Sequence, residues 1–302
     1  MSVSIKYKGS EIAALTASGT KTLNTAGKYC EGNIIVENTE SGGGDHTAED
    51  GLLSGTLSGA YVNSRVTKTA AYAFYYFSGL TSVSIPNAQA LGTGTFAQCS
   101  ALKTCNAPLV TKIPDQAFLS CKKLTDCTFG ALTEIKNSAF SSCTALTSLN
   151  TPAVTNIEQY AFRYCSALVS CSFPALQSMV GSYAFQGCSS LVDCNFPKAS
   201  SVGSGAFYNC TSLEKADFGA VKNLYYRAFD ACTALVALIL RGTSTVCALG
   251  DTSALQGTPI SSGTGYIYVP AALVDSYKAA TNWSSFAAQI RAIEDYPEIT
   301  GG

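Results

Sequence analysis

His46 is the only histidine in the 302-residue chain, and histidine is the side chain whose ordinary pKa lies nearest neutrality. It follows the glycine-rich run 41–45, a composition typical of a flexible linker, so we interpret it as a solvated loop residue. A serine or cysteine nucleophile would therefore have no histidine to act as its general base. The twenty Asp and Glu side chains are scattered, without a pair at glycosidase spacing. The sequence predicts a protein with no enzymatic activity and no cofactor.

The thirteen cysteines suggest disulfide or metal chemistry, yet eleven of them fall into two regular sets. The first set is Cys99, Cys121, Cys143, Cys165, Cys188, Cys210 and Cys232, and the second is Cys105, Cys127, Cys171 and Cys194. The spacing between the sets is C-x5-C rather than C-x2-C, which argues against zinc. Because free cysteine packs as a small apolar side chain, we predict a ladder of buried, reduced thiols. Cysteines on neighbouring coils would lie about 5 Å apart, the spacing of adjacent strands. The alternative is therefore that a few of them form disulfide bonds.

Three aspartates, Asp126, Asp193 and Asp217, are the remaining metal candidates. They are expected on one sheet surface but in different repeats, whereas calcium needs six or more converging oxygens. We interpret them as part of a solvated polar face, with a weak calcium site as the alternative.

Tyrosine is the residue type whose placement indicates binding. Nine of the sixteen tyrosines lie within four residues of a recurring phenylalanine: Tyr72, Tyr75, Tyr76, Tyr160, Tyr164, Tyr183, Tyr208, Tyr225 and Tyr226. A phenol offers a flat apolar ring and a hydroxyl, which suits sugar faces and protein hot spots. We hypothesise that part of this set contacts a ligand. The alternative is that these side chains only shield the edges of the repeats.

A fixed period positions these residues. Phenylalanine recurs at 74, 96, 118, 140, 162, 185, 207 and 229, and a leucine follows each of them six residues later. The first set of cysteines stands three residues after the phenylalanines and the second set nine residues after. A period of about 22 residues indicates one structural unit stacked many times.

Each repeat is interpreted as two short extended runs and a compact turn. In the first run, 168–174, Leu168, Cys171 and Phe173 are expected to point inward, and Pro174 ends the strand, because proline cannot donate to a sheet ladder. An apolar pair such as Val154 and Ile157 marks the second run, and the Ala-Phe pair follows in a helical or 3₁₀ turn. Stacked repeats then form a parallel sheet. Its outward positions are small and polar and lack aromatic anchors, which argues against tight protein binding there.

The two flanks do not follow the period. Alternating residues at 3–7, with short apolar runs at 12–15, 21–23 and 34–36, predict a small all-β module. Near the other end, 266–269 predict a strand and Pro270 the first turn of a helix. Thr281 or Asn282 is expected to cap a second helix. Its apolar face would hold Trp283, Phe286, Ile290 and Ile293.

The pattern AFxxCxxL, followed by F/I-P and an apolar pair, resembles the BspA-type leucine-rich repeat over about residues 62–240. The resemblance implies a solenoid with a parallel sheet along one face. It also implies a role, because the family occurs in bacterial surface adhesins and in phage and prophage proteins. The N-terminal IKYKGSEIAALTASGTKTLNTAGKYCEGNIIVEN is similar to short modules that open tail-associated proteins of phages infecting Gram-positive bacteria. The C-terminal GTGYIYVPAALVDSYKAATNWSSFAAQIRAIEDY is similar to tails that close such repeat arrays.

The predicted fold class is a leucine-rich-repeat solenoid with a parallel β-sheet and short helical or 3₁₀ turns. Residues 1–40 are assigned to a small β attachment module and 41–48 to a glycine-rich linker. Residues 49–242 are assigned to about eight 22-residue repeats and 243–302 to an α/β C-terminal cap.

The formal net charge of -1 leaves no basic face for nucleic acid or an anionic membrane. We therefore expect a non-enzymatic tail- or fibre-associated virion protein, made in the host cytoplasm, that presents its solenoid to a host-surface glycan or protein. Residues 1–40 would attach it to a virion or surface scaffold protein, and a homo-oligomer is expected. The alternatives are a bacterial cell-surface adhesin and a purely structural virion protein.

Overall fold

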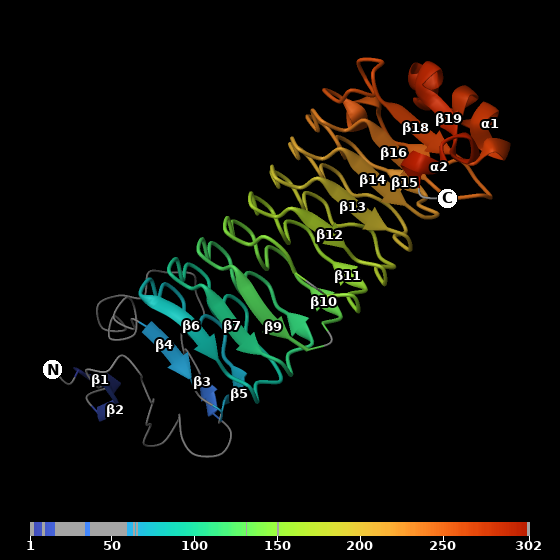
Figure 1. Ribbon diagram of the computed structural model, residues 1–302. Helices are drawn as coiled ribbons and strands as arrows, with labels where there is room; N and C mark the ends of the chain where they lie inside the picture. Colours follow the sequence, from blue (N-terminus) through green and yellow to red (C-terminus); the bar gives the residue numbers. More distant parts are fainter. Residues whose placement is uncertain are drawn as a thin grey trace. The chain divides into compact units, whose positions relative to one another are not determined.

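The computed structural model describes residues 3–7, 10–15, 34–36, 59–62, 64, 66–130, 132–149 and 151–300 (Figure 1). His46, the predicted linker and the strand predicted at 21–23 lie outside these residues. The chain divides into two compact units, each described by itself. Unit 1 comprises residues 1–132 and 139–146, and unit 2 comprises residues 133–138 and 147–302.

The strands are short and recur once or twice per repeat. In unit 1 they are β1 (Val3–Tyr7), β2 (Ser10–Leu15), β3 (Ile34–Val36), β4 (Gly59–Val62), β5 (Val66–Thr69), β6 (Leu80–Ser84), β7 (Thr104–Ala107), β8 (Lys112–Ile113) and β9 (Asp126–Phe129). In unit 2 they are β10 (Glu134–Ile135), β11 (Asn156–Ile157), β12 (Ser170–Ser172), β13 (Asp193–Phe196), β14 (Lys215–Phe218), β15 (Asn223–Leu224), β16 (Ala237–Leu240), β17 (Ala248–Leu249), β18 (Tyr266–Val269) and β19 (Ile290–Ala292).

Unit 1 is built on a four-stranded parallel sheet in the order β4-β6-β7-β9. Its register aligns equivalent repeat positions, so that Cys105 lies opposite Cys127. β1 and β2 form an antiparallel pair, as the alternation at 3–7 predicted. β3, which the sequence placed in the N-terminal module, pairs instead in parallel with β5 of the repeat stack.

Unit 2 contains a six-stranded parallel sheet in the order β12-β13-β14-β16-β18-β19. The second extended run of its repeats makes the shorter parallel pairs β10–β11 and β15–β17. Figure 1 shows successive coils laid side by side through these strands. The predicted fold class, a parallel β-sheet solenoid of stacked coils, is confirmed.

A ladder of phenylalanines fills the interior of the coils. In unit 2 the rings of Phe162, Phe185, Phe207 and Phe229 stack with centroids 5.2–5.3 Å apart. A second column, Phe173, Phe196 and Phe218, stacks at 5.7–5.8 Å beside the first. All of these rings are buried. The fixed sequence period thus becomes continuous columns of like residues, each ring packed on its equivalent in the next coil.

The cysteines are part of this interior. Of the twelve cysteines among the described residues, all except the half-buried Cys127 are buried, as predicted for a ladder of packed cysteine side chains. Cysteines of the first set donate an S–H hydrogen bond to the phenylalanine carbonyl of the preceding coil, for example from Cys210 Sγ to Phe185 O at 3.0 Å and from Cys232 Sγ to Phe207 O at 3.0 Å. The thiol therefore supplies a weak donor as well as apolar volume.

The C-terminal part of unit 2 closes the sheet with β18, β19 and short helical turns. The helical elements are η1 (Thr252–Leu255), η2 (Ala271–Leu273), α1 (Val274–Ala279), η3 (Trp283–Gln289), η4 (Ile293–Asp295) and α2 (Pro297–Thr300). Trp283 is fully buried, and its Nε1–H donates to the carbonyl of Cys247 at 2.6 Å. Among the described residues, no helix combines the length and apolarity that a bilayer crossing requires.

The predicted second helix of the cap is wrong in two respects. Its C-terminal half is the strand β19, which pairs with β18 and extends the sheet. Its first half is the 3₁₀ segment η3, and Asn282 does not cap it, because the Asn282 side chain donates to Leu249 O at 2.7 Å. Pairing with the open edge of β18 satisfies backbone groups that a helix would have left exposed on that edge.

Candidate binding surface

The compact turn of each repeat holds two residues in the left-handed backbone region. These residues stand two before and two after the recurring phenylalanine. Tyrosine occupies such positions at Tyr72, Tyr76, Tyr160, Tyr164 and Tyr183, where φ lies between 55° and 66°. Left-handed backbone is costly for a side chain other than Gly, Asn or Asp. The coil-to-coil hydrogen bonds made by the turns, such as Tyr164 N–H to Gln186 O at 2.7 Å, hold the backbone in place.

Unit 1 carries one tyrosine cluster, at its first complete turn. The ring of Tyr75 meets Tyr72 at 5.7 Å and Tyr76 at 5.1 Å, edge to face in both cases. Tyr76 is 52% exposed, whereas Tyr72 and Tyr75 are half-buried. The structure therefore brings these three predicted site residues together on one turn.

In unit 2 tyrosine rings lie flat between successive coils. Tyr160 stacks on Tyr183 with centroids 5.6 Å apart and an interplanar angle of 12°. The ring of Tyr183 covers Gly205, where an added Cβ would lie 2.3 Å from Cε1 of the ring. The ring of Tyr164 covers Gly187 in the same way. These contacts agree with the alternative prediction that tyrosines shield the repeat edges, but they leave Tyr164 41% exposed.

Two arginines complete the unit 2 surface. Arg163 lies over the rings of Tyr164 and Tyr160, at 4.5 and 5.3 Å from their centroids, and its Nη2 donates to Tyr164 Oη at 3.0 Å. This arrangement is a cation–π contact to both rings.

Arg227 lies over Tyr208 at 4.7 Å and Tyr226 at 5.9 Å. It also forms an ion pair with the buried carboxylate of Asp230. Tyr225 and Tyr226 are 42% and 52% exposed.

Sequence reasoning did not single out Arg163, Arg227 or the glycines beneath the rings. Arg163 directly precedes Tyr164, so its proximity to that ring was visible in the sequence. The pairing of a tyrosine with a glycine 22 or 23 residues later was also visible, because the period places those positions on adjacent coils. The left-handed conformation that lays the rings flat was not visible.

The polar sheet surface offers no comparable site. Arg241 binds Asp217 bidentately, with both hydrogen bonds at 2.8 Å, so this calcium candidate is already paired. Among the described residues, no group of three or more His, Cys, Asp or Glu side chains converges to hold a metal ion.

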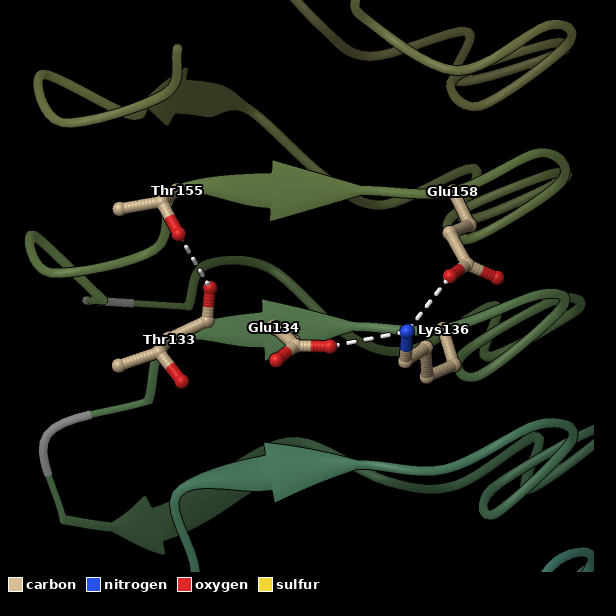
Figure 2. Close-up of polar contacts among 5 residues, drawn as sticks. All are labelled: Thr133, Glu134, Lys136, Thr155 and Glu158. Carbon is tan, nitrogen blue, oxygen red and sulfur yellow. Dashed lines mark hydrogen bonds and ion pairs between the residues drawn. The ribbon is translucent and has the colours of Figure 1, made fainter. Parts of the chain in front are cut away.

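Charged side chains also bridge the β10–β11 pair. Lys136 Nζ lies 2.8 Å from Glu134 Oε2 and 2.8 Å from Glu158 Oε1, while Thr155 Oγ1 donates to Thr133 O at 3.2 Å (Figure 2). The hydrogen bonds that Lys136 donates to the two glutamates raise its pKa. This network joins neighbouring coils, and its three charged groups are occupied with one another.

Replacing Gly205 by alanine should destabilise unit 2 by about 2 kcal/mol. The left-handed φ of 57° penalises any Cβ, and this Cβ would displace the ring of Tyr183 from its stack on Tyr160. Urea unfolding monitored by circular dichroism measures the loss. In the Tyr183→Ala background the ring clash is absent, so the cost of Gly205→Ala should shrink. Equal costs in the two backgrounds would contradict the proposed ring contact.

Comparison with known proteins identifies the repeat. The model of the BspA type leucine rich repeat region matches residues 54–169, 111–236 and 155–261. No curated protein matches the chain. These matches do not test the resemblance of the flanks to phage tail proteins.

Solved structures of leucine-rich repeat proteins are similar to the chain. A leucine rich cell surface protein from Faecalibacterium prausnitzii A2-165 is 19% identical, with 96% of this chain and 94% of that chain covered and a TM-score of 0.41. A leucine-rich repeat protein from Bacteroides ovatus ATCC 8483 is 17% identical, with 96% and 90% covered and a TM-score of 0.39. The T. pallidum leucine rich repeat protein is 24% identical, with 64% and 79% covered and a TM-score of 0.34. Since the family model spans more than half of the sequence, the chain belongs to the BspA type leucine-rich repeat family.

Proposed function

We propose that the chain is a non-catalytic recognition protein of a bacterial cell surface, an adhesin that contacts its ligand through the tyrosine-bearing turns. The observation that carries this proposal is the set of exposed phenols on rigid turns, above all Tyr164, Tyr225 and Tyr226. Tyr164 packs on Gly187 and Tyr226 lies against Arg227, so ordering these two rings on binding costs little side-chain entropy. Family membership supports the same role, because the BspA-type repeat occurs in surface adhesins.

The expected virion role depends on the resemblance of the flanking segments and on the occurrence of the same repeat in phage and prophage proteins. Attachment through residues 1–40 and assembly into a homo-oligomer remain predictions for both roles. The two roles differ in the surface that is bound. Under the adhesin proposal the bound surface is that of an animal cell, whereas a phage tail protein would bind the bacterium that the phage infects.

Replacing Tyr164, Tyr225 and Tyr226 together by serine should weaken cell binding at least tenfold. The change removes the most exposed aromatic contacts of unit 2 and leaves the buried phenylalanine ladder intact. The measurement is saturation binding of the fluorescently labelled chain to cultured epithelial cells and, in parallel, to Gram-positive bacteria.

A matched control is Val169→Ser combined with Val236→Ser, two side chains that are 48% and 47% exposed but lie outside the tyrosine turns. This control should change the affinity less than twofold. Equal binding by the tyrosine variant and the wild-type chain would remove the turns from the proposal. Tyrosine-dependent binding confined to bacteria would favour the virion role over the adhesin.

A further inference from the structure

The charge of Arg163 is not neutralised by an acidic side chain within the part of the chain that the structure describes. Arg227 and Arg241 of the same unit have carboxylate partners, Asp230 and Asp217, and Arg291 donates to the carbonyls of Ala288 and Ile290. Arg163 instead rests on two phenol rings and donates to one hydroxyl. Its Nε is buried and has no hydrogen-bond partner among the described residues. Because that buried Nε is closed to a ligand, the donors left for one are the N–H groups of Nη1 and the second N–H of Nη2.

The acidic residue nearby in sequence does not supply the missing partner. Glu158 is held by Lys136 at 2.8 Å, on the β10–β11 side of its coil (Figure 2). The rings of Tyr160 and Tyr164 hold the guanidinium in place, and a cation–π contact through its flat face leaves N–H groups on its edge for other partners. Such an N–H edge can bind a carboxylate or a phosphate through two parallel hydrogen bonds, and of these two anions we take the carboxylate.

The surroundings of Arg163 indicate what carries that carboxylate. The ring of Tyr183 packs between Tyr160 and Gly205, so it offers its edge and hydroxyl rather than a face. Tyr164 likewise packs on Gly187 beneath Arg163. A ligand that lies across two neighbouring coils would contact a phenol edge and a hydroxyl on each coil, from Tyr164 on the first and Tyr183 on the second. Sugar rings match this surface, because they alternate C–H faces with hydroxyl groups and repeat along a polymer.

We propose that Arg163, Tyr160, Tyr164 and Tyr183 form a binding site for an acidic sugar of a surface glycan. The guanidinium of Arg163 pairs with the sugar carboxylate, and the phenols contact the ring and its hydroxyls. This inference rests on the proposed recognition function and specifies the chemistry of its ligand.

The test uses the full chain and three carboxylated probes, namely oligosialic acid, hyaluronan oligosaccharides and oligogalacturonate. Each probe is paired with its methyl ester, which removes the negative charge and keeps the sugar. Isothermal titration calorimetry should show binding of at least one acid form, at least tenfold tighter than binding of its ester. The sialic acid arm represents animal cell surfaces and the galacturonate arm plant polysaccharides. Failure of all three acids to bind would overturn the proposal.

Arg163→Gln should weaken binding of the acid form at least tenfold and leave binding of the ester within twofold. Arg163→Lys should retain part of the affinity, because lysine keeps the charge but loses the bidentate geometry. The matched control is Lys198→Gln, which removes an exposed positive charge of unit 2 outside the tyrosine turns and should change the affinity for the acid form less than twofold. Affinity of Arg163→Gln for the acid equal to that of the wild type would overturn the proposal.

Failure of this inference is distinguishable from failure of the adhesin proposal. Cell binding that depends on Tyr164, Tyr225 and Tyr226 but is unchanged in Arg163→Gln would retain the recognition role and reject the acidic ligand.

Discussion

Replacing Phe207 by alanine should lower the free energy of unfolding of unit 2 by about 3–5 kcal/mol, the usual cost of truncating a buried phenylalanine. Phe207 is fully buried. Its ring stacks on Phe185 at 5.3 Å and on Phe229 at 5.2 Å, and meets Phe196 and Phe218 edge to face at 5.9 and 6.3 Å. Alanine would therefore leave a cavity that four other phenylalanines border. Flanking coils cannot close this cavity without breaking their own strand register.

Urea unfolding monitored by the fluorescence of Trp283 measures this loss, because the single tryptophan is buried in the same unit. Phe207→Leu should cost clearly less, since leucine fills most of the cavity. Val192→Ala alters a side chain that is 39% exposed and should stay within about 0.5 kcal/mol of the wild type. If Phe207→Ala lowered the free energy of unfolding by less than about 1 kcal/mol, the phenylalanine ladder would not be a main source of the stability of unit 2.

The repeat explains why the interior was predictable. A residue such as Phe207 occurs in eight copies at one phase, so its inward position is tested eight times within the sequence. The alternation of the first run is likewise repeated, and it placed Cys194 and Phe196 on the buried side of β13. Repetition turns a weak local preference into a strong prediction, because every coil must satisfy the same stacking.

The cap shows where this advantage ends. Ile290 occurs once, and its spacing from Trp283 and Phe286 fits a helical face equally well. The structure instead places Ile290 opposite Ile267 in a parallel sheet. Local spacing cannot reveal that β18 leaves an edge to be paired, since that edge arises only when the coils stack.

The binding surface falls between these two cases. The nine tyrosines were identifiable from their proximity to the recurring phenylalanines. Their ring orientation depends on left-handed backbone at residues such as Tyr183, which sequence propensity disfavours. The platform under Arg163 therefore emerged only from the structure.

Alkaline conditions should unfold the chain, because its buried thiols are held protonated. Burial in the apolar interior raises the pKa of ten cysteines, to about 12 for Cys105 and Cys247. The other eight are Cys99, Cys121, Cys127, Cys171, Cys188, Cys194, Cys210 and Cys232. In the unfolded chain the same thiols ionise near pH 8.5. Above that pH the unfolded state binds fewer protons than the native state, so stability falls as the pH rises.

The size of the effect follows from linkage. Each such thiol lowers the free energy of unfolding by about 1.4 kcal/mol per pH unit between its unfolded and native pKa values. Ten thiols together cost on the order of 10 kcal/mol or more by about pH 9.5, which is comparable to the whole stability of an ordinary domain. Burial also raises the pKa of Tyr277 to about 12, which adds to the loss above pH 10. We therefore expect full stability below about pH 8 and unfolding between about pH 9 and 10.5.

Urea midpoints at pH 7, 8, 9 and 9.5, under reducing conditions, measure this dependence. The matched variant replaces Cys105, Cys127, Cys171 and Cys194 by valine, which the chain itself uses at the equivalent position of the first repeat, Val83. Removing four titrating thiols should reduce the slope by about 5 kcal/mol per pH unit and shift alkaline unfolding to higher pH. Midpoints that stay constant up to pH 9.5, or an identical slope in the four-valine variant, would show that the thiols do not govern alkaline stability. A smaller dependence of the unfolding free energy on pH in the four-valine variant would mean that the buried cysteine columns set the pH above which the fold is lost.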